Sequence, residues 1–238
     1  PYIVNIDNCN DALPQGQKDL GLEVKQSNLC SEITLPTNDE RTAVCCLSSV
    51  NLEHFDEWSK EEKFIDDLVT MLDNVLEHFI ENAVDLNSLG GYNANYERFK
   101  KHIKEGKEGF TKAAYSAYRE RSIGLGAMGF HSYLQNQNIP FEGIFSTGIN
   151  YKLFKFIKGA AVSASRRLAV LRGEAPDISN SGLRNCHLLA VAPNASSSII
   201  CGGTSPSIEP IRANVFTHKT LSGSYKAVSY THLRAHET

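Results

Sequence analysis

The chain has 238 residues, of which 41% are hydrophobic, so it can bury a sizeable core and is neither disordered nor fibrous. Its 24 Lys and Arg residues against 27 Asp and Glu residues give a net charge of −3, with no basic cluster for duplex phosphates, which argues against nucleic-acid binding. No run reaches the ~18 apolar residues of a membrane span, and no signal-peptide pattern opens the chain. We therefore expect a cytoplasmic protein without membrane association.

Two short apolar runs in the first fifth of the chain predict buried strands. Residues 2–6 (YIVNI) and residues 42–47 (TAVCCL) are both bounded by polar residues. The period then becomes helical, because Ser59 and Glu62 match a capping box and apolar residues follow at spacings of three and four. The residues expected on the buried face of this helix are Phe64, Leu68, Leu72, Val75, Phe79 and Ala83.

A second helix is predicted over residues 151–171, again from helical spacing of apolar residues, with Gly173 as the residue that ends it. A third apolar run at residues 188–192 stops at Pro193 and predicts another strand. Strands separated by long helices indicate an α/β fold with a largely parallel sheet.

Residues 27–32 (SNLCSE) place an amide, a thiol and a carboxylate at alternate positions. In an extended loop alternate side chains point the same way, so Asn28, Cys30 and Glu32 are expected to converge on one ligand. Such a set supplies a hydrogen-bond donor, a sulfur nucleophile or radical and a proton acceptor. The alternative is a buried cysteine between solvated polar residues, which the spacing alone favours.

Two adjacent cysteines, Cys45 and Cys46, lie on the second predicted strand. Neighbouring strand residues face opposite sides, so only one of the two can share a site with Cys30. The alternative is that both are small buried hydrophobes. No metal site is predicted, because the cysteines and histidines lack the spacing of zinc ligands.

Two further motifs suggest nucleotide binding. The turn at residues 193–198 (PNASSS) follows a predicted strand, and its hydroxyl and backbone N–H groups suit a phosphate, although an ordinary helix cap has the same composition. Gly124, Gly126 and Gly129 match the dinucleotide fingerprint G-x-G-x-x-G. Because this match follows a charged, helix-like run rather than a strand, close helix packing at small residues explains it better.

Taken together, these segments resemble the large (α) subunit of class I ribonucleotide reductase. The matching segments are residues 5–10 (NIDNCN), 26–33 (QSNLCSEI), 43–52 (AVCCLSSVNL), 123–129, 187–198 and 208–210 (IEP). The resemblance covers about residues 2–225, and the N-L-C-x-E segment is its most specific part. It implies part of a ten-stranded α/β barrel, with Cys30 as a radical cysteine on a central finger loop.

The resemblance also implies a function, the reduction of ribonucleotides, with diphosphates favoured, to deoxyribonucleotides for DNA synthesis. Cys30 would be the thiyl radical that removes the 3′ hydrogen, Glu32 would take the 3′-hydroxyl proton, and Asn28 would hold the substrate. Cys45 would be one of two redox-active thiols, whereas Cys46 receives no role. The further residues implied in substrate binding are Ser27, Leu29, Pro193, Asn194, Ala195, Ser196 and Ser197.

No cofactor is expected in this chain, because the resemblance implies that a metal-containing small (β) subunit supplies the radical. The other implied partners are the ribonucleotide, a second large subunit in a homodimer, and thioredoxin or glutaredoxin as reductant. The ATP and dNTP effector sites, the second redox cysteine and the tyrosine relay are expected outside the chain. Residues 1–227 are thus expected to be an internal piece of the catalytic barrel, inactive alone, and residues 228–238 an adaptor-derived tail.

Two other functions remain open from the sequence. One is a nicotinamide-dependent oxidoreductase that uses Gly124, Gly126 and Gly129. The other is a non-catalytic nucleotide-binding fragment in which Cys30 is only structural.

Overall fold

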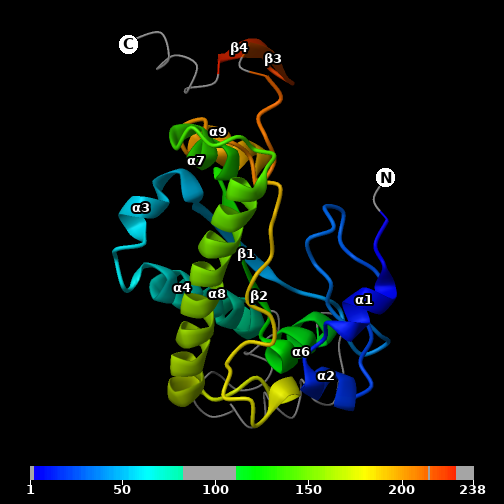
Figure 1. Ribbon diagram of the computed structural model, residues 1–238. Helices are drawn as coiled ribbons and strands as arrows, with labels where there is room; N and C mark the ends of the chain where they lie inside the picture. Colours follow the sequence, from blue (N-terminus) through cyan, green and yellow to red (C-terminus); the bar gives the residue numbers. More distant parts are fainter. Residues whose placement is uncertain (1–2, 83–110, 214, 229–238) are drawn as a thin grey trace. The chain divides into compact units, whose positions relative to one another are not determined.

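A computed structural model describes residues 3–82, 111–213 and 215–228 of the chain (Figure 1). The chain divides into two compact units, each of which is described by itself. The first unit consists of Pro1–Ser48, Ile65–Leu125 and Lys158–Ala190, and the second of Ser49–Phe64, Gly126–Ile157 and Val191–Thr238.

The strand predicted at residues 2–6 is wrong for residues 3–6, because a helix begins at Ile6 instead, and Tyr2 lies outside the described residues. Helix α1 (Ile6–Asp11) is capped by Asn5, whose Oδ1 accepts hydrogen bonds from the backbone N–H groups of Asp7 at 3.1 Å and Asn8 at 3.2 Å. These bonds satisfy donors that a first helical turn otherwise leaves unpaired, so Asn5 favours the helix over a strand. Ile3, expected in the core, is almost fully exposed. A second short helix, α2 (Gln15–Asp19), follows.

A mixed α/β architecture is confirmed, although the strands lie mostly elsewhere than predicted. Strands β1 (Cys46–Asn51) and β2 (Ile123–Met128) pair in a two-stranded sheet. The strand predicted at residues 42–47 therefore begins four residues later, and the run at 188–192 contributes only a parallel bridge between Leu189 and Leu125. In the second unit, β3 (Val215–Thr220) and β4 (Gly223–Val228) form an antiparallel hairpin.

Gly124 and Gly126 of the G-x-G-x-x-G match lie within strand β2, and Gly129 follows the strand directly. A Cβ on Gly124 would overlap the Leu47 side chain and stand 2.8 Å from Cβ of Ala190. Close packing at a small residue is thus confirmed at Gly124, in a strand rather than a helix. Gly129, with φ of 80°, precedes helix α7 (Phe130–Asn136).

Helix α4 (Phe64–Asn82) confirms the first long helix, but its start and its buried face differ from prediction. Ser59 ends the short helix α3 (Phe55–Trp58), and its backbone N–H donates to the Phe55 carbonyl, so it does not cap α4. The residues of α4 that are buried are Ile65, Val69, Leu72, Asp73, Leu76 and Ile80. Val75, predicted inside, is exposed, because α4 carries two apolar stripes and periodicity alone cannot choose between them. Ala83 lies outside the described residues.

Helix α8 (Ile144–Arg172) confirms the second long helix and begins seven residues before the predicted start. Gly173 ends it as predicted, with φ of 86° and a backbone N–H that donates to the Ala169 carbonyl at 2.8 Å. None of the helices in the described part of the chain is long and apolar enough to cross a membrane.

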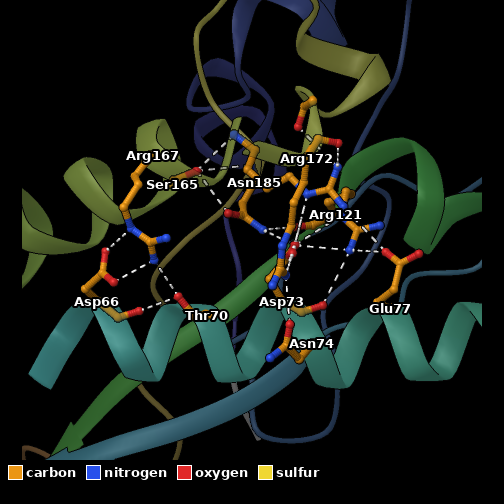
Figure 2. Close-up of polar contacts among 12 residues, drawn as sticks. Asp66, Thr70, Asp73, Asn74, Glu77, Arg121, Ser165, Arg167, Arg172 and Asn185 are labelled. Atoms are coloured by element: carbon orange, nitrogen blue, oxygen red, sulfur yellow. Dashed lines mark hydrogen bonds and ion pairs between the residues drawn. The ribbon is translucent and has the colours of Figure 1, made fainter. Parts of the chain in front are cut away.

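A buried ionic network centred on Asp73 of α4 joins several segments of the first unit (Figure 2). The Asp73 carboxylate accepts from Arg121 at 3.1 Å and from Arg172 at 2.7 Å, and Arg121 also pairs with Glu77 at 2.7 Å. Arg184 approaches the same carboxylate at 3.3 Å. Although burial alone would raise the pKa of Asp73, the arginine charges lower it below the ordinary value. The network ties α4 to α8 and to the start of β2.

Short helix α6 (Thr111–Glu120) leads into β2 through Arg121, which has a left-handed φ of 48°. The second unit also contains η1 (Leu52–His54) and α9 (Ala195–Ile200), and the first contains η3 (Pro176–Ile178). These three elements are each a single turn or little more.

Candidate active site

The segment around Cys30 is a closed loop rather than the extended segment expected from the sequence. The Ser31 N–H donates to the Asn28 carbonyl at 3.1 Å and closes a turn, and Ser31 adopts a left-handed φ of 63°. The Ser27 hydroxyl donates to the Ile33 carbonyl at 2.7 Å and joins the two ends of the loop. The extended conformation expected for Asn28, Cys30 and Glu32 is therefore wrong, and the alternation of strand side chains gives no reason for the three to converge.

Asn28 holds this loop together, and Cys30 lies at its exposed tip. Oδ1 of Asn28 accepts from the Ile33 N–H at 3.1 Å, so this oxygen is engaged within the loop. Cys30 is exposed, and Leu29 beside it is 93% exposed. An exposed thiol in a turn that is fixed by its own hydrogen bonds is accessible to a reactant from outside the chain.

Glu32 has one carboxylate oxygen inside the protein without a donor. Oε2 of Glu32 is shielded from solvent, and no group in the described ranges forms a hydrogen bond with it. An unsatisfied buried acceptor is costly, and in native proteins such an atom commonly has a functional partner. Glu32 is thus able to accept a proton or a hydroxyl hydrogen bond from a bound molecule.

Cys45 lies within electrostatic range of Glu32, although 13 positions separate them in the sequence. The pKa of the Cys45 thiol is raised to about 12, chiefly by burial and to a smaller extent by Cys46, Glu120 and Glu32. Burial alone raises the pKa of Cys46, without a contribution from Glu32. The structure therefore brings Cys45 and Glu32 into one neighbourhood, with both thiols half-buried.

The Ser-rich turn belongs to the second unit and does start a helix, α9. Nδ2 of Asn194 donates to the Ser49 hydroxyl at 2.9 Å and to the Ala192 carbonyl at 2.8 Å. Both amide hydrogens thus hold the turn to the protein rather than pointing to a ligand. The residues of the predicted set that are exposed here are Pro193, Ala195, Ser196 and Ser197.

The predicted residues accordingly form two sets. Residues 27–32 and Cys45 belong to the first unit, and residues 193–197 to the second. Within the part of the chain that the structure describes, no three His, Cys, Asp or Glu residues group as metal ligands do.

A buried polar cluster near Cys45 was not predicted from the sequence. Arg41 donates to both carboxylate oxygens of Asp177, at 2.5 Å and 3.0 Å, although 136 positions separate the two residues. Glu120 lies 3.5 Å from the same arginine, and the Ser122 hydroxyl connects Glu120 with His187. Each residue alone looks like an ordinary surface residue in the sequence, because only long-range folding brings these side chains together.

Comparison with known proteins places the chain in one family. The family model "Ribonucleotide reductase, barrel domain" matches residues 1–181 and 175–237. The ribonucleoside-diphosphate reductase large subunit of Invertebrate iridescent virus 3 is 48% identical over 225 residues, which cover 94% of this chain and 32% of that protein. The putative large subunit of Frog virus 3 is 46% identical over 229 residues, or 96% of this chain and 37% of that protein.

A solved structure agrees with the sequence matches. The class Id ribonucleotide reductase alpha subunit of Actinobacillus ureae superposes with a TM-score of 0.76 at 37% identity, covering 90% of this chain and 37% of that chain. The chain thus spans about a third of the length of the curated relatives it matches. Because the family model covers nearly every residue, the chain belongs to the ribonucleotide reductase barrel-domain family.

Proposed function

We propose that the chain is the catalytic part of a ribonucleoside-diphosphate reductase large subunit, which reduces ribonucleotides to deoxyribonucleotides. The observation that carries this proposal is the exposed thiol of Cys30 two positions in the sequence from Glu32, whose Oε2 is buried and has no donor among the described residues. The reductases that are similar in sequence and structure support it. In the intact protein, β1 and β2 would belong to a ten-stranded barrel, with the Cys30 turn as its finger loop.

The first chemical step in this proposal uses Cys30 and Glu32. Cys30, as a thiyl radical, takes the hydrogen atom from C3′ of the ribose, which forms S–H and leaves a radical on C3′. Glu32 accepts the 3′-hydroxyl proton, a role that its unsatisfied Oε2 supports. The radical that generates the thiyl comes from a metal-containing small subunit. Asn28 holds the loop closed, because its Oδ1 accepts a hydrogen bond from the Ile33 N–H.

The second step uses Cys45. The 2′-hydroxyl leaves as water, and two thiols supply the two electrons and two protons that balance this loss, ending as a disulfide. Cys45 is one of these thiols, and the other lies in a different part of the intact protein. Cys30 then returns its hydrogen atom to C3′. The raised pKa of Cys45 supports this role, because the group remains a protonated thiol that has a hydrogen to give.

The substrate is proposed to be a ribonucleoside diphosphate. Its phosphates would bind the exposed hydroxyls of Ser196 and Ser197 and the N–H groups of the turn, with Pro193 and Ala195 alongside. Asn194 contributes by holding the turn through Ser49. The further residues proposed to contact the nucleotide are Ser27 and Leu29.

The remaining partners follow from the same proposal. They are the small subunit, a second large subunit in a homodimer, and thioredoxin or glutaredoxin, which reduces the disulfide in the cytoplasm. ATP and dNTP effectors would bind to other parts of the intact protein.

Replacing Cys30 by Ser tests the proposed function. We expect Cys30→Ser in the intact large subunit, assayed with its small subunit, to abolish deoxyribonucleotide formation while leaving ribonucleotide binding nearly unchanged. The matched control is Cys201→Ser, because Cys201 is also exposed but lies at the end of α9. Turnover by Cys30→Ser at the rate of Cys201→Ser would overturn the proposal.

A further inference from the structure

Residues 23–37 form a loop with Cys30 at its tip, and the two arms of this loop are joined to each other at two levels. At the base, the Thr37 N–H donates to the Glu23 carbonyl at 3.3 Å. Nearer the tip, the hydrogen bonds within residues 27–33 described above join the arms again. Because all these bonds lie within the loop, they fix its shape but not its place relative to the rest of the protein.

Asn10 supplies the hydrogen bonds that join this loop to the rest of the protein. Its Oδ1 accepts from the Val24 N–H at 2.7 Å, and its Nδ2 donates to the Val24 carbonyl at 3.2 Å. Among the residues that the structure describes, these are the only two hydrogen bonds between residues 23–37 and other parts of the chain. One side chain thus makes all the directional contacts of the loop with its surroundings in the described part of the chain.

The two bonds of Asn10 imitate the pairing of neighbouring strands. In a hydrogen-bonded antiparallel pair, a residue uses both its N–H and its C=O toward the residue opposite. The Asn10 amide offers the same acceptor and donor from a single planar group, so Val24 is paired without a strand beside it. Val24 is 1% exposed, and an unpaired backbone group at a buried residue is costly, so this pairing also lets Val24 enter the core.

Apolar packing does not fix the register of the loop by itself. Val24 on one arm and Leu35 on the other are both buried, and they anchor the base of the loop. Burial of apolar surface is non-directional, so it holds the arms down without selecting one register. A hydrogen bond is directional and is lost when its two atoms separate by about 1 Å more, so the Asn10 amide selects the register.

Asn10 is in turn placed by helix α1. The side chain of Asn5 caps the first turn of this helix, and Asn10 lies in its last turn, where its carbonyl accepts from the Leu13 N–H at 3.2 Å. The cap at one end therefore favours the helix that presents the Asn10 amide at the other. The two asparagines of residues 5–10, a segment that resembles the reductase family, thus act at opposite ends of one short helix.

We propose that Asn10 is a positioning residue for the radical chemistry: its amide sets the register of the loop that carries Cys30 and Glu32. Asn10 bonds to the backbone of the loop, so its effect reaches Cys30 through Val24 and the residues between them. The inference rests on the proposed function, in which the Cys30 sulfur takes a hydrogen atom from the ribose. A misplacement of about 1 Å in such a transfer lowers the rate about 100-fold.

Asn10→Asp in the intact large subunit, assayed with its small subunit, tests the inference. Aspartate has nearly the same shape and keeps the acceptor for the Val24 N–H, but it replaces the donor by an oxygen that repels the Val24 carbonyl. We expect kcat for ribonucleoside diphosphate reduction to fall about 10- to 100-fold. KM should change less than about threefold, because the proposed phosphate contacts, residues 193–197, belong to the second unit.

Asn8→Asp is the matched control. Asn8 lies on the same helix and is exposed, and its side chain forms no hydrogen bond with any residue that the structure describes. The same change of charge and shape should therefore leave kcat and KM within about twofold of the wild type.

Hydrogen exchange of the substrate-free protein separates positioning from a general loss of stability. In Asn10→Asp we expect the backbone amides of residues 23–37 to exchange at least about tenfold faster, while those of α4 exchange at the wild-type rate. Equal acceleration in α4 would mean that Asn10 supports the whole fold, and it would contradict a specific positioning role.

A second variant keeps the Asn10 amide and weakens the helix that presents it. Asn5→Ala removes the cap of α1, so we expect a smaller fall of kcat, about threefold, with KM unchanged. If Asn10→Asp does not fold, this variant decides alone.

A wild-type kcat in the folded variants, or wild-type exchange of residues 23–37, would overturn the inference. These failures differ from failure of the proposed function, because the exchange measurement needs no turnover. Turnover that survives Cys30→Ser would remove the radical role of Cys30 and leave the control of the loop by Asn10 standing.

Discussion

Gly124 is packed so closely against its neighbours that the position does not tolerate a larger residue. A Cβ at Gly124 would meet Leu47, Ala190 and the Cys45 sulfur. The absence of a side chain at Gly124 is therefore what lets the Cys45 segment lie against β2.

Gly124→Ala is expected to destabilise the protein by roughly 1–3 kcal/mol, because overpacking forces neighbouring atoms to shift. Gly159→Ala is the matched control. Gly159 lies in the middle of α8, where a Cβ meets nothing within 4 Å, so alanine should stabilise by about 0.5–1 kcal/mol. Urea unfolding of both variants measures the difference, and equal effects of the two substitutions would contradict the packing argument.

Single residues also show where sequence reasoning about the site succeeds and fails. The thiol and carboxylate of residues 27–32 could be proposed from the family resemblance, because the motif is contiguous, and their roles stay predictions. The turn that presents Cys30 could not, since it depends on the left-handed conformation of Ser31 and on the bond between Ser27 and Ile33. The cluster around Glu120 could not be predicted either, because its partners come from distant segments.

At the scale of elements, helical periodicity predicts that a helix is present more reliably than it predicts which face of the helix is buried. Helices α4 and α8 were both predicted, and Gly173 marked the end of α8 correctly. The buried face of α4 was misassigned, because Asp73 lies among its core residues and a buried carboxylate breaks the hydrophobic pattern. The strand predicted from the apolar run at the start of the chain does not form at residues 3–6, because the hydrogen bonds of the Asn5 cap favour a helix from Ile6.

In the network of Figure 2, Asp73 should contribute far more to the free energy of unfolding than the ion pair between Asp66 and Arg167. Asp73→Asn removes the charge shared by three arginines and leaves two of them, Arg121 and Arg184, buried without a full counter-charge, so we expect a loss of ~3–5 kcal/mol.

Asp66→Asn is the matched control on the same helix. Asp66 accepts from Arg167 at 2.6 Å, but both side chains are partly exposed, so its loss should cost only ~0–1 kcal/mol. Denaturant unfolding compares the two variants, and equal losses would show that burial does not set the strength of these pairs.

At the scale of the whole molecule, the family assignment and the chemistry rest on different observations. The family model and the relatives cover nearly all of this chain, whereas the chain covers about a third of those relatives. The chemistry rests on the geometry of residues 27–33 and Cys45. The central claim is that the two cysteines have different roles, with Cys30 as the radical and Cys45 as an electron donor.

Disulfide mapping after one turnover tests this claim most directly. The pre-reduced intact large subunit, with its small subunit, converts one equivalent of ribonucleoside diphosphate in the absence of external reductant, and its free thiols are then alkylated and mapped. The account predicts one deoxyribonucleotide per active site, Cys45 in a disulfide, and Cys30 and Cys46 still free to react. Product formation with Cys45 still reduced, or with Cys30 in the disulfide, would contradict it.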